Sequence, residues 1–456
     1  MGVYRSLFPA MDTAVFGHRL IMHSIAGKRV YMVSLGCAKN RVDSEKTLYI
    51  LARNGCTVTN TAENADVILI NSCGFTNDAR RETVETVLEL SRLKEKNPGL
   101  KIAVIGCMVE ILKEEMAAEM PEIDLLLPLS DASMSEVYSS DNEKRLVQPG
   151  AVSAYLKIAE GCANSCSFCS IPLIRGPLKS RPMDEILKEA RALKDKGVKE
   201  ICLVAQDTTR YGADLGIKDG LVKLLANIVK SGPEWIRVMY AYPALVTDDL
   251  LKIIAAEPSI CPYFDVPFQH INDTILKSMG RRETGDSIKR LVDKIREKVP
   301  GAAIRSSFIT GFPGEGQKEF KELEKFLDDY MLDHVGIFTF SPEVKTPSYA
   351  LGDPVPDDEK NERKAILMET QRDVSRELNG QKVGKKFDAL VEKYNESESL
   401  LTGRLQTQGP EVDGEVILDE CEAGPGEIII IEVTQAMEYD VIGKPASLAA
   451  MKSPGI

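Results

Sequence analysis

The stretch EGCANSCSFCSIPLIRG, residues 160–176, decides how the chain is organised, because it places three cysteines in one short loop. They are Cys162, Cys166 and Cys169, in the spacing C-x-x-x-C-x-x-C. A structural zinc ion takes four Cys or His ligands, but no histidine lies near these three, and the next cysteine, Cys202, is a whole predicted strand–helix unit away. Iron–sulfur clusters are also held by thiolates. The spacing therefore predicts a 4Fe–4S cluster with one iron open to another ligand.

The loop follows the first of six strand–helix units that are predicted for the middle of the chain. Each predicted strand is a short apolar run, and amphipathic helical stretches lie between the runs. The runs are residues 154–160, 200–207, 235–242, 263–270, 303–312 and 334–342. Six units predict a partial (β/α) barrel, and loops at the C-terminal ends of barrel strands carry active sites. The cysteine loop is therefore in the right place for chemistry.

A smaller α/β pattern precedes this region and carries a second cysteine triple. Buried strands are predicted at residues 29–36, 66–72 and 101–106, each followed by a helix-like segment, which is typical of a doubly wound parallel sheet. Each strand ends beside a cysteine, and these cysteines are Cys37, Cys73 and Cys107. Because the carboxyl ends of parallel strands share one edge of a sheet, where ligands bind, the triple predicts a second site.

The remaining segments complete the predicted architecture. Residues 356–380 predict a long charged helix that ends at Gly380. After residue 384, short strands separated by Gly, Pro and Asn turns predict a small antiparallel barrel of five strands. The predicted fold class is α/β, with an N-terminal doubly wound sheet, a six-unit barrel core and a small C-terminal β-barrel. The predicted divisions are a disordered extension at 1–28, then domains at 29–145, 146–384 and 385–448.

Composition limits the environment and the partners. The 456 residues contain ten cysteines and no apolar run long enough to cross a membrane, and the first 28 residues lack the pattern expected of a secretory signal. We therefore expect a cytoplasmic protein without membrane partners, in a reducing compartment where metal or catalytic roles of cysteine gain weight. The net charge is −12. Since phosphate contacts need Lys and Arg, nucleic acid is not expected as a direct substrate.

With Phe168 before the third cysteine, the loop resembles the signature of the radical S-adenosylmethionine (SAM) superfamily, Cys-x-x-x-Cys-x-aromatic-Cys. The resemblance implies a cluster whose open iron binds SAM and which, once reduced, cleaves SAM to methionine and a 5′-deoxyadenosyl radical. It also implies SAM contacts from two further segments, and their candidate residues are Gln206 and Asp207 in AQDTTRYG, and Gly311, Gly314 and Glu315 in SSFITGFPGE. From the residues alone, the first pair can equally cap a helix, and Gly-Phe-Pro-Gly can be an ordinary turn.

The second triple, placed before this core with a small barrel behind it, resembles the methylthiotransferase family over residues 29–447. In that family the N-terminal cysteines hold an auxiliary 4Fe–4S cluster, whose open iron carries the sulfur that is transferred. One SAM methylates this sulfur and a second supplies the radical. The resemblance also implies an external electron donor and a sulfur source, and it assigns no catalytic residue beyond the clusters. After Cys107 the chain reads Met-Val where the family has Gln-Arg, so contacts of that loop are in doubt.

The family has two branches, which modify adenosine in transfer RNA or the β carbon of an aspartate in small-subunit ribosomal protein twelve. The segments SLGCAKNRVDSE and AQDTTRYG are closer to the ribosomal-protein branch. Residues 381–456 contain 7 Lys and Arg against 14 Asp and Glu, a net −7, which suits a basic protein and repels RNA. Glu411, Asp413 and Glu415 are the predicted docking acids.

A hypothesis of another class is an electron carrier with two iron–sulfur clusters and no substrate. It predicts four cysteines for each cluster and no cleavage of SAM. The two triples favour the transferase.

Overall fold

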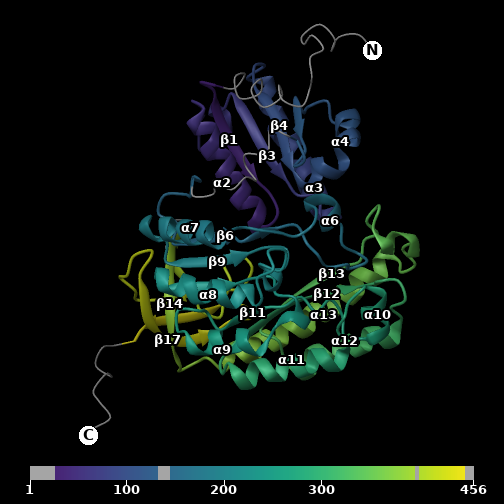
Figure 1. Ribbon diagram of the computed structural model, residues 1–456, viewed down its shortest axis with the longest axis vertical. Helices are drawn as coiled ribbons and strands as arrows, with labels where there is room; N and C mark the ends of the chain where they lie inside the picture. The colour runs from purple at the N-terminus through teal and green to yellow at the C-terminus, as the bar shows by residue number, and fades with distance from the viewer. Residues whose placement is uncertain (1–25, 132–143, 396–399, 447–456) are drawn as a thin grey trace. The chain divides into compact units, whose positions relative to one another are not determined.

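The computed structural model of the chain describes residues 26–131, 144–395 and 400–446 (Figure 1). The predicted disordered extension lies almost wholly outside these described residues. The chain forms two compact units. The first contains the chain up to Val147 together with Glu160–Cys162 and Ser170–Pro177, and the second contains the rest, including the C-terminal barrel. Within the described ranges, no helix is both long enough and apolar enough to cross a bilayer.

The first unit is built on a five-stranded parallel sheet in the order β2-β1-β3-β4-β5. Its strands are β1 Arg29–Ser34, β2 Thr57–Val58, β3 Val67–Ser72, β4 Lys101–Gly106 and β5 Leu125–Leu127. Its helices are α2 Ala38–Arg53, α3 Asn77–Ser91, α4 Cys107–Glu119 and the short α6 Ile171–Arg175, with 3-10 turns η1 Ala62–Asn64 and η2 Arg92–Glu95. The three predicted strands are β1, β3 and β4.

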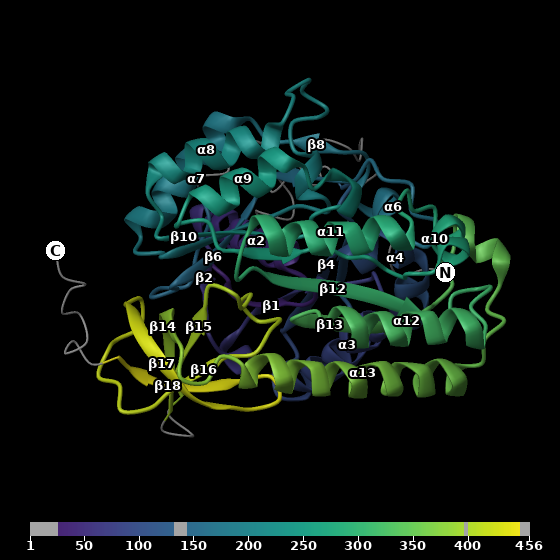
Figure 2. The same cartoon turned by 90° about the horizontal axis from the view of Figure 1, so that it is seen from below.

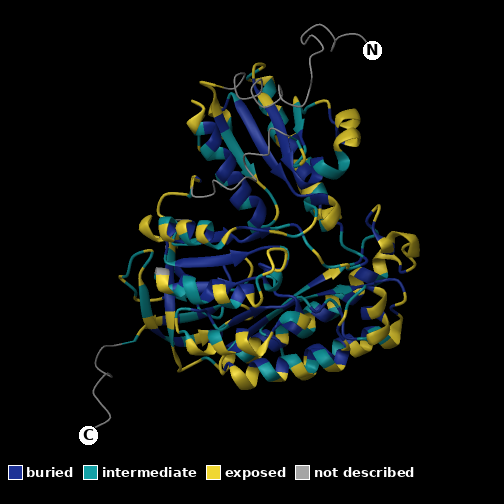
Figure 3. Cartoon of the chain, in the orientation of Figure 1, coloured by how far each residue is buried: buried dark blue, intermediate teal, exposed yellow. Residues whose placement is uncertain are grey.

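Helices cover both faces of this sheet. Strands β3 and β4 are buried along almost their whole length (Figure 3). Ile50 of α2 belongs to the core with Leu69 on one face, whereas Val87 of α3 belongs to the core with Ile68 and Ile70 on the other. Successive strand residues point to opposite faces, so an all-apolar strand requires cover on both sides. The doubly wound prediction is confirmed.

The second unit contains the six predicted parallel strands, arranged as two sheets in the orders β10-β9-β6 and β11-β12-β13. The strands are β6 Ser153–Lys157, β9 Glu200–Val204, β10 Trp235–Val238, β11 Tyr263–Asp265, β12 Ala303–Thr310 and β13 His334–Thr339. The helices are α7 Met183–Asp195, α8 Gly220–Ser231, α9 Asp248–Ala256, α10 Asp273–Ser278, α11 Gly285–Lys298, α12 Gln317–Tyr330 and α13 Asp357–Gly380. Short elements are β7 Ala159–Glu160, β8 Lys179–Ser180, η4 Thr208–Arg210, η5 Pro243–Leu245 and η6 Pro347–Leu351.

Helix α13 ends at Gly380 as predicted, packs along α12 and β13, and ends beside the C-terminal barrel (Figure 2). The barrel closes in the order β14-β15-β16-β18-β17. Its strands are β14 Lys386–Asn395, β15 Leu400–Leu405, β16 Val416–Leu418, β17 Ile428–Ala436 and β18 Val441–Pro445. The five strands are confirmed, but β16 and β18 pair in parallel, so the prediction of a wholly antiparallel barrel is wrong at this one pairing.

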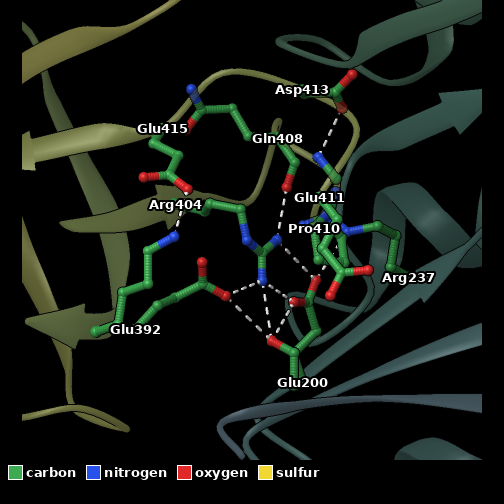
Figure 4. Close-up of polar contacts among 12 residues, drawn as sticks. Glu200, Arg237, Glu392, Arg404, Gln408, Pro410, Glu411, Asp413 and Glu415 are labelled. Atoms are coloured by element: carbon green, nitrogen blue, oxygen red, sulfur yellow. Dashed lines mark hydrogen bonds and ion pairs between the residues drawn. The ribbon is translucent and has the colours of Figure 1, made fainter. Parts of the chain in front are cut away.

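Buried charges join the C-terminal barrel to the parallel strands. Arg404 of β15 pairs with Glu200 and, at 2.7 Å, with Glu392, and it donates to the Gln408 carbonyl (Figure 4). Arg237 pairs with the same Glu200 at 2.7 Å. Burial opposes ionisation of Glu200, but the two arginines outweigh it and lower its pKa to about 2. Its contribution to stability is therefore present above the usual carboxyl pKa and is lost as the pH falls towards 2.

Asp413, predicted as an exposed docking residue, belongs to this buried interface instead. Its side chain is 1% exposed, and it accepts hydrogen bonds from Tyr263 at 2.6 Å and from the Gly409 N–H at 2.7 Å. Arg305 lies 3.3 Å from it. Tyr263 and Glu200 each begin a parallel strand, so this interface lies at the N-terminal ends of the strands. The C-terminal ends, where parallel strands position ligands, stay available for chemistry.

We predict that Glu200→Gln destabilises the second unit by about 3–5 kcal/mol, because it leaves Arg237 buried without its countercharge and removes one of the two carboxylates that pair with the buried Arg404. Urea unfolding followed by circular dichroism measures the loss. The control is Asp249→Asn, which removes an exposed ion pair with Lys252 and should leave the unfolding midpoint unchanged. Equal midpoints for both variants would contradict the role given to Glu200.

Candidate functional site

The structure brings the N-terminal cysteine triple to one edge of the first unit's sheet. In register, Ser34 of β1 pairs with Asn71 of β3, and Ser72 pairs with Gly106 of β4, so the three strands end level with one another. Cys37 is the N-cap of α2, Cys107 is the first residue of α4, and Cys73 directly follows β3. The predicted convergence of these strand ends is observed.

Glycines allow the chain to run close enough for the sulfurs to meet. Gly36 has a φ of +82°, and a Cβ built on it would lie 2.6 Å from Cys73 Cβ and 2.8 Å from Cys73 Sγ. Gly106 has a φ of +99°, and its Cβ would lie 2.4 Å from Asn71 Oδ1. Each position requires a left-handed backbone and has no room for a side chain. Packing at this edge of the sheet therefore requires glycine immediately before Cys37 and before Cys107.

Asn40 holds the strand ends together and was missed by the sequence analysis. It is fully buried in the first turn of α2, and its Nδ2 donates to the carbonyls of Leu35 and Ser72, both at 3.0 Å. Its Oδ1 lies 3.6 Å from Cys107 Sγ. The sequence feature that could have identified Asn40 is a polar residue three positions after Cys37, in the first turn of a helix that begins at the same edge of the sheet.

The three thiols share an electrostatic environment. Burial, and then the other two thiols, raise the pKa of Cys73 to about 11. Burial also raises the pKa of Cys107, although Arg175 opposes the shift. At Cys37, burial opposes ionisation, but Lys39 and Arg175 outweigh it and lower the pKa. The sulfurs are therefore near enough to act on one another, and the positive charge of Arg175 opposes the effect of burial at all three thiols.

This donor set fits an iron–sulfur cluster. It consists of sulfur alone, it is largely buried, and it lies at a ligand-binding edge. In the part of the chain that the structure describes, no three His, Cys, Asp or Glu side chains are arranged to hold a single metal ion. In a 4Fe–4S cube each thiolate binds a different iron, so its ligands stand further apart than the ligands of one ion.

The loop with the other cysteines contributes residues to both units, with Cys162 in the first and Cys166 and Cys169 in the second. In the second unit, Ser167 anchors it. The Ser167 N–H donates to the Met279 carbonyl and its hydroxyl donates to the Ser278 carbonyl, both at 2.8 Å. The backbone around Cys166 and Cys169 is thereby fixed on the end of α10.

Phe168, the aromatic residue of the motif, packs against the glycine turn after β12. It contacts the apolar cluster formed by Ile275, Met279, Phe312 and Phe340. Phe312 lies inside the Gly311–Gly314 segment that the resemblance implied for SAM. Two motifs about 140 residues apart in the sequence therefore meet in one cluster.

The turn is conformationally demanding. Gly311 has a φ of +77° and Gly314 a φ of +97°, and a Cβ on Gly311 would lie 2.4 Å from Lys360 Cγ. The positive φ angles of the turn are enough to explain why glycine occupies both positions. They leave the expected contact with SAM as a prediction.

Glu315, an expected SAM contact, holds the turn, and its contact with SAM stays a prediction. Its Oε1 accepts from the Gly311 N–H at 3.0 Å, from Thr310 at 2.9 Å and from Arg363 at 2.6 Å. Its Oε2 lies 3.1 Å from His270 Nε2. Burial opposes its ionisation, but these partners outweigh burial and lower its pKa. The structure assigns Glu315 to holding the turn, and the same bonds give His270 a structural role.

Asp207 caps the η4 turn, which was the alternative to SAM contact. Its Oδ1 accepts from the Thr209 N–H at 3.0 Å, and its Oδ2 accepts from Asn164 of the cysteine loop at 2.7 Å. Arg210 Nε donates to Asn164 Oδ1 at 2.8 Å. Gln206 lies two residues after the end of β9. Asp207 therefore links the end of β9 to the cysteine loop.

Comparison with known proteins gives three matches to family models. Residues 29–128 match Uncharacterized protein family UPF0004, residues 156–327 match the Radical SAM superfamily, and residues 383–445 match the TRAM domain. The ribosomal protein uS12 methylthiotransferase RimO of Aquifex aeolicus is 43% identical over 423 residues, which cover 91% of this chain and 97% of that protein. The protein of the same name from Myxococcus xanthus is 40% identical over 441 residues, 93% of each chain.

The chain belongs to the RimO family. The family matches confirm the predicted resemblance to the ribosomal-protein branch of the radical SAM methylthiotransferases, and they confirm the order of the three parts of the fold. As a radical SAM protein, this RimO-family chain uses an iron–sulfur cluster and SAM. Among solved structures, the radical SAM methyltransferase TsrM from Kitasatospora setae is similar at a TM-score of 0.47 and 13% identity, covering 78% of this chain and 77% of that chain.

We predict that Gly36→Ala removes about half of the bound iron, because the new Cβ collides with Cys73 while the other cysteine loop is untouched. Gly55→Ala is the matched control, since Gly55 has a φ of +88° but has no atom within 4 Å of the place that a Cβ would take. Both variants carry the backbone strain, and only one carries the collision. Iron assays after anaerobic reconstitution distinguish them, and equal iron contents would refute the packing argument.

Proposed function

We propose that the chain is a uS12 methylthiotransferase that uses two 4Fe–4S clusters and SAM to add a methylthio group to the β carbon of an aspartate of uS12. The observation that carries the proposal is the largely buried triple Cys37, Cys73 and Cys107 at one sheet edge, in a chain that also has the radical SAM triple. The names of relatives at about 40% identity support the uS12 substrate.

The residues take the following roles in this proposal. Cys162, Cys166 and Cys169 would hold the radical SAM cluster, and the N-terminal triple would hold the cluster that carries the sulfur. When bound and reduced, the radical SAM cluster supplies the electron that cleaves SAM to the hydrogen-abstracting radical. Ser167 and the Glu315-bonded turn fix the backbone around this chemistry. Asn40 fixes the auxiliary thiols.

The two alternatives are less well supported. An electron carrier needs four protein ligands for each cluster, whereas each site here offers three cysteines. A transfer RNA substrate needs a basic surface, whereas the C-terminal barrel segment is acidic.

Replacing Cys37, Cys73 and Cys107 together by Ala should halve the iron content, preserve reductive cleavage of SAM and abolish methylthiolation of uS12, because the transferred sulfur then has no cluster to occupy. Mass spectrometry of uS12 and chromatography of 5′-deoxyadenosine measure the two activities. Cys421→Ala, in the C-terminal barrel, is the control and should behave as the parent.

Wild-type iron content in the triple variant would show that these cysteines are core residues. Unmodified uS12 after incubation with the fully loaded parent would contradict the substrate assignment itself.

The structure also identifies exposed acids that suit a basic partner. Within the β16–β17 connection, residues 419–427, four carboxylates are exposed. They are Asp419, Glu420, Glu422 and Glu427. Replacing the first three by Lys should slow association with uS12, because complementary charge mainly raises the association rate. Added salt should slow the parent in the same way, since exposed charges are screened over about 8 Å near physiological ionic strength.

The control for this prediction makes the same change in net charge elsewhere. Glu362, Glu369 and Asp373 are exposed on α13, and their replacement by Lys should slow association less. Stopped-flow measurement of uS12 binding compares the two triple variants. Equal rates would show that only net charge matters, and tighter binding to uS12 in the first variant would contradict the docking proposal.

A further inference from the structure

Arg175 is the last residue of α6 and lies six positions after Cys169, yet its side chain belongs to the first unit. Its Nη2 donates to Cys107 Sγ at 3.2 Å and to Asn40 Oδ1 at 2.5 Å. The side chain is only 3% exposed. The segment that carries the radical SAM cysteines therefore also delivers a buried cation to a thiol of the auxiliary site.

Two carboxylates fix the other side of the guanidinium. Its Nη1 donates to Asp43 Oδ2 at 2.7 Å and to Glu160 Oε1 at 3.3 Å. Asp43 is 1% exposed and comes from the same helix as Asn40. The planar guanidinium presents its N–H donors in fixed directions. Because the two carboxylates hold Nη1, Nη2 is directed at the sulfur of Cys107. A cation that only balanced the charge of the two carboxylates would not need to direct an N–H donor at the sulfur.

Hydrogen bonds to cysteine sulfur are among the features that set the reduction potential of an iron–sulfur cluster. An N–H donor stabilises the more negative, reduced cluster and raises its potential. Such outer partners of metal ligands also fix the ligands' orientation. Arg175 has the geometry for both effects on the thiolate of Cys107.

We propose that Arg175 is a positioning residue of the auxiliary cluster, whose N–H donated to Cys107 sulfur raises the reduction potential of that cluster. The inference rests on the proposed auxiliary cluster and adds a residue from outside the N-terminal domain to its surroundings. The radical SAM loop and the sulfur-carrying cluster then depend on one continuous segment, residues 162–175.

The test uses the full chain with Cys162, Cys166 and Cys169 replaced by Ala, so that any bound cluster is the auxiliary one. After anaerobic reconstitution, an EPR-monitored redox titration gives its midpoint potential. In this background, Arg175→Met should lower the reduction equilibrium constant about tenfold, which is about 59 mV for a one-electron couple. Arg175→Lys keeps a positive charge beside Asp43 but lacks the second row of N–H donors of the guanidinium. It should therefore lower the midpoint potential by a smaller amount.

Arg29→Met is the control, because Arg29 pairs with Asp66 at the opposite end of β1 from Cys37, and it should leave the potential unchanged. The lysine variant retains the buried ion pair, so it keeps the test valid if the methionine variant fails to fold. Iron-loaded Arg175→Lys and Arg175→Met proteins with the parent's potential would overturn the inference. A parent background that binds no iron would overturn the auxiliary cluster itself, and this result is distinguishable because it appears before any change at Arg175.

Discussion

The hydrogen bonds from Asn40 to the carbonyls of Leu35 and Ser72 are the interaction on which the arrangement of the N-terminal cysteines depends. They tie the end of β1 to the end of β3 where two cysteines leave the sheet, and the same side chain reaches the third cysteine. A buried amide without partners is costly, so these bonds specify one arrangement of the strand ends. Together with Gly36, which removes a colliding Cβ, they turn three cysteines distant in sequence into one donor set.

The second unit uses buried charge for a different purpose. Glu200, Arg237 and Arg404 join the C-terminal barrel to the N-terminal ends of the parallel strands. Burying charges costs desolvation, and such a network stabilises the fold only when every member keeps its partners. The network holds the barrel at the N-terminal ends of the strands. The opposite ends are left to the cysteine loop and the Glu315-bonded turn. The acids of residues 419–427 stay outside this interface and remain exposed.

Sequence analysis predicted the features whose signals are local. Strands appear as apolar runs, the cysteines lie at the ends of these runs, and the C-x-x-x-C-x-x-C spacing lies in a single loop. Each of these features can be recognised from a few neighbouring residues. Asp413 was misjudged, and the hydrogen bonds of Glu315 were not predicted, because their partners, such as Tyr263 and Arg363, lie about 150 and 48 residues away. Arg175 was overlooked for the same reason, since only the folded chain brings it to Cys107. The parallel pairing of β16 with β18 likewise depends on barrel closure and has no local signature.

The central claim is that one chain holds two iron–sulfur clusters, each on three cysteines. Anomalous diffraction at the iron absorption edge, from crystals of the anaerobically reconstituted protein, tests it most directly. The account predicts two iron peaks of similar strength, one bounded by Cys37, Cys73 and Cys107 and the other by the loop cysteines of residues 162–169. A single peak at the loop, with the N-terminal thiols packed together without iron, would contradict it.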